Sequence, residues 1–106
     1  MSARVLWLDT ETFCERPIRD GLFAYAEVSE TIIIAKAWDD EDVEVYATED
    51  VPDWAAQLQA EIDLADEVVI HNSPFERHTL AKYGITIPVE KITDTYALAL
   101  QHGFPA

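Results

Sequence analysis

The sequence contains a single cysteine and no long apolar run. Cys14 alone cannot form an internal disulfide, so a disulfide-stabilised scaffold is excluded and a reducing compartment such as the cytoplasm is expected. The longest apolar stretch, residues 31–35, is far too short to span a membrane, and no secretory signal precedes the first expected strand. We therefore expect a cytoplasmic protein with no membrane partner.

Basic residues are also scarce. Seven Lys and Arg stand against 21 Asp and Glu, which gives a formal net charge of −14 at pH 7. This charge opposes broad electrostatic binding of nucleic acid by the chain alone, although bound metal ions or a neighbouring basic domain would still permit a nuclease. Cys14 has no activating pattern around it, and no histidine has a Cys or second His at zinc-ligand spacing. Neither a thiol nucleophile nor a zinc site is therefore expected.

Hydrophobic periodicity predicts one small α/β domain over the 106 residues. Three strands should form an antiparallel meander, and alternating helices and strands should then pair in parallel, giving a mixed sheet with helices on both faces. The expected strands cover residues 5–11, 31–38, 43–47, 67–71 and 91–93, and the expected helices cover residues 52–65, 73–83 and 95–102. Asp94 is expected to cap the last helix, and Trp7, Trp38 and Trp54 are expected in the core.

Two carboxylates follow the first apolar stretch with one residue between them. In an extended chain Asp9 and Glu11 project from the same face, about 6.6 Å apart along the strand. Two acids crowded in a dry site need a compensating cation, and carboxylate oxygens suit Mg²⁺ or Mn²⁺. The alternative is an ordinary polar turn after the strand, in which Asp9 or Thr10 caps local amides. This stretch alone leaves both interpretations open.

A second informative stretch, residues 71–76, lies where a strand passes into a helix. Ser73 as N-cap, Pro74 as the first helical residue and Glu76 three positions after the cap fit a capping box. In that interpretation Glu76 binds a backbone amide and has no catalytic role. In the alternative, Glu76 joins the acids of the first strand, because sites in α/β sheets gather at strand ends.

Taken together, the two stretches resemble the DEDD (DnaQ-like) 3′–5′ exonucleases of the ribonuclease-H-like fold, with the greatest similarity to proofreading domains of phage and bacterial family A DNA polymerases. Residues 8–12, Leu-Asp-Thr-Glu-Thr, resemble the first motif of that family, Asp-x-Glu. Residues 71–76, His-Asn-Ser-Pro-Phe-Glu, resemble the second motif, Asn-x-x-Phe-Asp, with Glu76 in place of the usual Asp.

The resemblance implies a site and an activity. The implied catalytic metal ligands, for two Mg²⁺ or Mn²⁺ ions, are Asp9, Glu11 and Glu76. The implied residues of the terminal-nucleotide pocket are Thr10, Thr12, Asn72 and Phe75. The implied reaction is phosphodiester hydrolysis at the 3′ end of single-stranded DNA, serving proofreading beside a polymerase domain of the same chain in a bacterial or phage-infected cell.

One family motif is missing. The third motif, Tyr-x-x-x-Asp or His-x-x-x-Asp, should lie beyond the last expected helix, and the match at Tyr46–Asp50 precedes the second motif and is taken as coincidence. Residues 1–106 are therefore expected to be the N-terminal part of an exonuclease domain, nearly inactive without its fourth carboxylate. Two alternatives remain open: a non-catalytic scaffold or protein-binding module of the same fold, and a related RNA 3′ exonuclease.

Overall fold

A mixed five-stranded sheet is the centre of the fold. The computed structural model describes residues 4–13, 30–71, 73–101 and 103. The strands, in chain order, are β1 (Val5–Phe13), β2 (Glu30–Trp38), β3 (Glu44–Ala47), β4 (Glu67–Ile70) and β5 (Ile92–Asp94). The α-helices are α2 (Trp54–Leu64), α3 (Ser73–Ala81) and α4 (Thr95–Gln101), and short 3-10 turns cover Thr48–Asp50 and Val89–Lys91.

The strand order in the sheet is β3-β2-β1-β4-β5. β1 pairs with β2, and β2 with β3, in antiparallel fashion, whereas β1 with β4 and β4 with β5 are parallel. The predicted meander followed by parallel strands is thus confirmed, as is the α/β class. Residues 14–29, which include Cys14, lie outside the described residues, as do Asn72 and His102.

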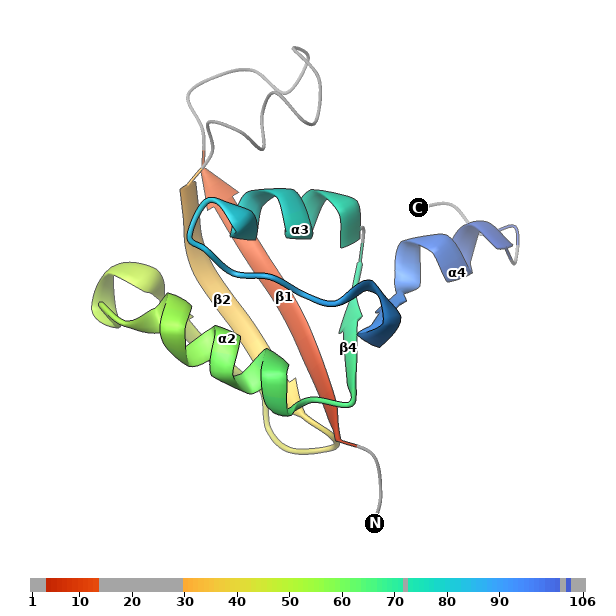
Figure 1. The fold of residues 1–106 in the computed structure, drawn as a ribbon, viewed down its shortest axis with the longest axis horizontal. Coiled ribbons are helices and arrows are strands. Elements are labelled where there is room, and N and C mark those ends of the chain that lie inside the picture. Colours follow the sequence, from red (N-terminus) through yellow and green to blue (C-terminus); the bar gives the residue numbers. More distant parts are fainter. Residues whose placement is uncertain (1–3, 14–29, 72, 102, 104–106) are drawn as a thin grey trace.

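Helices α2 and α3 lie side by side over one face of the sheet, in front of β1 and β2 in Figure 1. Helical spacing puts Trp54, Leu58 and Ile62 of α2 on one side, and all three are buried. They pack against alternate residues of the central strands, including the fully buried Leu6 and Val68. One hydrophobic core therefore fills the layer between the two helices and the sheet.

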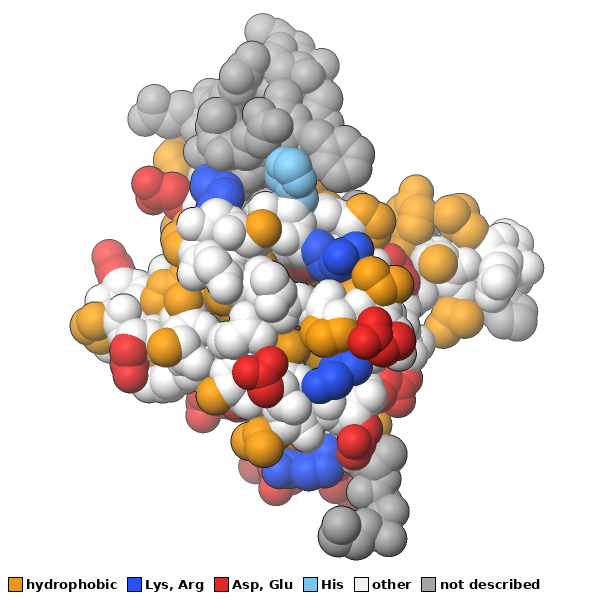
Figure 2. Space-filling model, viewed as in Figure 1, with side chains coloured by type: hydrophobic (Ala, Val, Ile, Leu, Met, Phe, Trp, Pro, Cys, Tyr) orange, Lys and Arg blue, Asp and Glu red, His pale blue; other side chains and the backbone are white. Residues whose placement is uncertain are grey.

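The expected helical cover of the second face is not seen among the described residues. Helix α4 extends away beyond β4 (Figure 1), and it has no buried residue. Its Leu98 and Leu100 are exposed, in keeping with the hydrophobic side chains that stand out on α4 in Figure 2. Trp7 and Val45, on the uncovered face, are also exposed. β1 is apolar on both faces, but only one of its faces is covered. Apolar residues on both faces of a strand therefore did not show that helices cover both sides.

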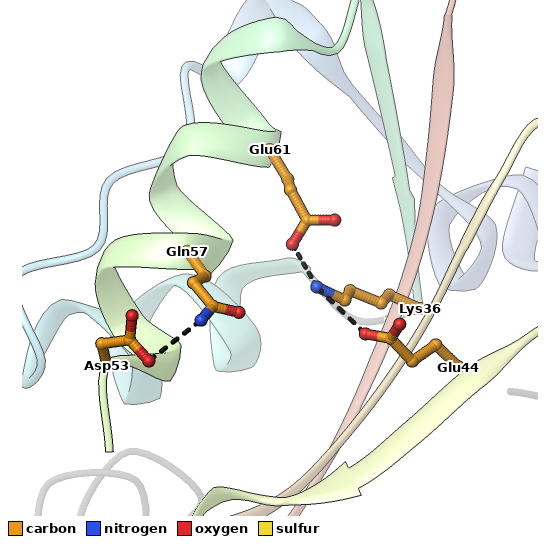
Figure 3. A network of polar contacts seen from close by, with 5 residues as sticks. All are labelled: Lys36, Glu44, Asp53, Gln57 and Glu61. Atoms are coloured by element: carbon orange, nitrogen blue, oxygen red, sulfur yellow. Dashed lines mark hydrogen bonds and ion pairs between the residues drawn. The ribbon is translucent and has the colours of Figure 1, made fainter. Parts of the chain in front are cut away.

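A buried lysine side chain links the sheet to α2 across the core layer. Lys36 of β2 is 7% exposed, and its Nζ forms an ion pair with Glu61 of α2 and a second, 3.5 Å long, with Glu44 of β3 (Figure 3). The Tyr46 ring lies 5.3 Å from the same ammonium group. Burial lowers the pKa of Lys36, but the hydrogen bond and charge of Glu61, with help from Tyr46 and Glu44, raise it above its ordinary value. The ammonium group is therefore charged wherever the protein is folded near neutral pH.

Candidate active site

The acids of the first motif lie within a strand and not in a turn. β1 continues through Asp9 and Glu11, which pair with Ala35 and Ile33 of β2. The alternative of a local polar turn is therefore wrong. Asp9 and Glu11 are exposed on the uncovered face, as the strand alternation predicts, whereas Thr10 points to the helix-covered face and is partly buried.

Glu76 is held against the strand from the helix side. It lies in the first turn of α3 and is only 5% exposed. The Thr10 hydroxyl donates a 2.5 Å hydrogen bond to Glu76 Oε2. In a capping box the backbone amide of Ser73 would donate a hydrogen bond to the Glu76 carboxylate. Here that amide donates to Asp94 Oδ2 at 2.6 Å. The carboxyl group of Glu76 therefore faces the first motif, and the capping-box interpretation is wrong.

Glu76 is an unusual carboxyl group electrostatically. Its pKa is raised to about 7, mainly by burial; the hydrogen bond from Thr10 lowers the pKa in part, and the charge of Asp9 adds to the rise. The charge of Asp9 thus affects the protonation of Glu76, although the two residues are far apart in the sequence. Near pH 7 the Glu76 carboxyl group is therefore partly protonated.

This shift makes stability depend on pH. The folded protein keeps Glu76 protonated up to about pH 7, whereas the unfolded chain releases the proton near the ordinary value of 4.5. Stability is therefore fully present below 4.5 and falls as pH rises through 7, by about 3 kcal/mol for this one group. We expect Glu76→Gln to remove that loss, seen as the difference between urea unfolding of wild type and variant from pH 4.5 to 8. Equal slopes for the two proteins would contradict the prediction.

A row of polar side chains crosses the uncovered face beside Asp9. The parallel register pairs Trp7 with Val69 of β4, and the next residues on the same face are Asp9 and His71. Both line a hollow of about 490 Å³ with Thr95, which follows β5. His71 Nδ1 and Thr95 Oγ1 are 3.0 Å apart. Sequence reasoning placed neither His71 nor Thr95 in the site, although both directly follow strands that lie beside one another.

The hollow has an apolar floor. Trp7, Ala35, Ala37 and Val69 line it next to the polar row. Trp7 is 48% exposed there, so its predicted place in the core is wrong, whereas Trp54 is buried as predicted. Trp38 is partly buried and packs against the core, with the Arg4 guanidinium 4.0 Å above its ring.

The remaining predicted residues are only partly brought together. Glu11 stays exposed further along β1, and Thr12 and Phe75 are partly buried. Asp94 has the predicted capping role, because its Oδ1 accepts from the amide of Tyr96 at 2.9 Å. Its second role, at the start of α3, could not be read from the sequence because it joins two elements that are far apart in the chain.

The donor set of Asp9 and Glu76 fits a hard divalent cation. Mg²⁺ commonly binds through one or two carboxylates and fills its other positions with water or phosphate oxygens. In the part of the chain that the structure describes, no three His, Cys, Asp or Glu side chains come together as ligands. The charge of Asp9 acts on Glu76, but the three predicted ligands do not form such a cluster, and metal binding by Asp9, Glu11 and Glu76 stays a prediction.

Comparisons with known proteins find similarity at the level of the fold. No family model matches the chain, and no curated protein matches it. Among solved structures, the chain is similar to the family B DNA polymerase from the hyperthermophilic archaeon Pyrobaculum calidifontis, with a TM-score of 0.62 and 20% sequence identity. The match covers 95% of this chain and 16% of the polymerase chain.

This similarity shows the fold. The chain has a mixed α/β fold that occurs within a DNA polymerase and is compatible with the predicted ribonuclease-H-like class. The relationship to family A polymerases in particular stays a prediction. Within the described ranges, no helix has the length and apolar character needed to cross a bilayer.

Proposed function

We propose that this chain forms part of a metal-dependent 3′–5′ exonuclease that removes nucleotides from single-stranded DNA ends, working with a polymerase domain of the same protein. One observation carries the proposal: Thr10 hydrogen-bonds the buried Glu76 carboxyl group, and the charge of Asp9 helps to raise the pKa of that group, although the two acids come from distant stretches. A structural role alone gives no reason to keep a carboxyl group with a pKa of about 7 beside a second acid.

The residues of the site have distinct tasks in this proposal. Asp9 presents its carboxylate on the open face of β1, where a phosphate of the substrate can approach. Thr10 fixes the carboxyl group of Glu76 from the other side of the strand, so that its orientation does not depend on solvent. Asp9 and Glu76 would hold Mg²⁺ or Mn²⁺, which supplies charge stabilisation and a nucleophilic water in phosphodiester hydrolysis.

The direct test is digestion of single-stranded oligonucleotides by the natural protein that contains residues 1–106. We expect a 3′ label to be released first, as nucleoside monophosphate, in the presence of Mg²⁺ or Mn²⁺ and not with chelator. A 3′-phosphorylated oligonucleotide serves as a control with a blocked end. Release of a 5′ label first, or an equal rate with chelator, would exclude the proposed polarity or the proposed metal dependence.

A protein-binding module is the second candidate, because one face of the sheet exposes Trp7, Val43 and Val45. The digestion assay separates the two. If the natural protein releases no nucleotide from either end with metal present, the non-catalytic function is favoured. An RNA oligonucleotide of the same sequence, run in parallel, decides between DNA and RNA as substrate.

A further inference from the structure

The polar row on the uncovered face extends the candidate site beyond its acids. Asp9, His71 and Thr95 occupy corresponding positions on or just after the three neighbouring strands β1, β4 and β5. The β4–β5 register pairs Val69 with Thr93, so that His71 and Thr95 are the next residues on the same face. Because both side chains line one hollow with Asp9, a group bound at Asp9 lies next to the imidazole ring.

Nδ1 of His71 and the Thr95 hydroxyl form a hydrogen bond, and the tautomer of the ring decides which of the two is the donor. The Thr95 hydroxyl has an acceptor of its own, the carbonyl oxygen of Ile70 at 3.4 Å. With its proton directed there, the Thr95 oxygen accepts from Nδ1–H of His71 at 3.0 Å. In the neutral ring this leaves Nε2 with a lone pair, so Nε2 is a hydrogen-bond acceptor.

The ring of His71 is also restrained in its orientation. Tyr96 contacts it edge-on, with the ring centroids 5.4 Å apart and the planes at 70°. Two contacts, from Thr95 and Tyr96, therefore hold an otherwise exposed side chain. A side chain held in this way loses little further rotamer freedom when a ligand binds, which favours a role in recognition.

We propose that His71 recognises the sugar of the terminal nucleotide, with Nε2 accepting a hydrogen bond from a sugar hydroxyl. This inference rests on the proposed function, since it places the scissile phosphate at Asp9 and Glu76. The phosphate is an acceptor only, so a neutral Nε2 cannot bind it, whereas a sugar hydroxyl is the nearest donor of the same nucleotide. The apolar floor of the hollow beside the row, which includes Trp7 and Val69, is suited to the carbon face of the nucleoside.

The hydroxyl can be the 3′ group of a deoxyribonucleotide or the 2′ group of a ribonucleotide, and three probes separate them. Thymidine 5′-monophosphate, its 2′,3′-dideoxy analogue and ribothymidine 5′-monophosphate share one base and one phosphate. We would measure their dissociation constants for the chain with Mg²⁺ present by NMR titration. Loss of the recognised hydroxyl is expected to weaken binding up to about tenfold, the contribution of one hydrogen bond.

Two variants of His71 provide the matched comparison. His71→Asn keeps a donor near the position of Nδ1, for Thr95, but has no group at the position of Nε2. His71→Gln can place its side-chain oxygen near that position. We expect the preference for the hydroxyl-bearing nucleotide to fall to about 1 in His71→Asn and to be retained in part in His71→Gln.

The outcomes distinguish this inference from the function on which it rests. A hydroxyl preference that is unchanged in His71→Asn, or the absence of any preference in wild type, overturns the role of His71. Nucleotide binding that ignores both Mg²⁺ and the Asp9→Asn substitution overturns the proposed function as well. Metal-dependent binding that Asp9→Asn abolishes, with a preference that His71→Asn removes, supports both.

Discussion

Replacing Asp9 with Asn is expected to lower the single-turnover rate of 3′-end digestion by about 10²–10³-fold, the cost commonly found when one group that stabilises transition-state charge is removed. Asn keeps the size of the side chain and removes its charge. Because Asp9 is exposed on β1 and pairs through its backbone with Ala35, the substitution should leave the fold intact. The measurement is release of a labelled 3′ nucleotide by the natural protein at saturating Mg²⁺.

Asp42→Asn is the matched control for this experiment. It removes one negative charge from the same acidic surface, but it lies in the exposed turn between β2 and β3. We expect its digestion rate to stay within about twofold of wild type, because Asp42 does not line the hollow and the charge of an exposed carboxylate is largely screened by salt. Similar losses in the two variants would show that Asp9 acts only through the overall charge of the protein.

Glu61→Ala is expected to destabilise the protein by about 3 kcal/mol, because it leaves a buried charge without its main partner. The substitution leaves the Lys36 ammonium group buried, and among the described residues its remaining ionic partner is Glu44, itself 67% exposed (Figure 3). The penalty arises from the uncompensated buried charge and not from the lost attraction alone. The free energy of unfolding from urea titration at pH 7 measures it.

Two further variants test this explanation. Glu44→Ala should cost less than about 1 kcal/mol, because exposed ion pairs contribute little. The double substitution Lys36→Met with Glu61→Leu should restore the stability lost in Glu61→Ala, because apolar side chains of similar volume can replace a buried pair without loss. If the double variant is as unstable as Glu61→Ala, the cost comes from the packing of α2 and not from the charge of Lys36.

The sequence was most informative where a feature is local. Alternation along β1 predicted that Asp9 and Glu11 share a face, and helical spacing predicted that Trp54, Leu58 and Ile62 pack together. The parallel pairing in the second half of the chain followed from the alternation of helices and strands, since such connections favour parallel pairing.

Features that depend on tertiary contacts could not be predicted in the same way. A glutamate at position 76 fits a capping box and a metal ligand equally well. The hydrogen bond from Thr10, across the core layer, shows that the side chain faces the first motif. His71 and Thr95 meet because of the register between β4 and β5, which a single sequence does not specify. Trp7 has the same apolar neighbours in the sequence whether the second face of the sheet is covered or open. Its exposure depends on what covers that face.

Asp94 also links the mobility of two helices. One of its oxygens accepts from the Ser73 amide at the start of α3, and the other accepts from the Tyr96 amide at the start of α4. A movement that pulls α4 away from β5 therefore also withdraws an acceptor from α3, three residues before Glu76. In mechanical terms the two helix starts form one joint, so the orientation of the buried carboxyl group is tied to a helix that has no buried residue of its own.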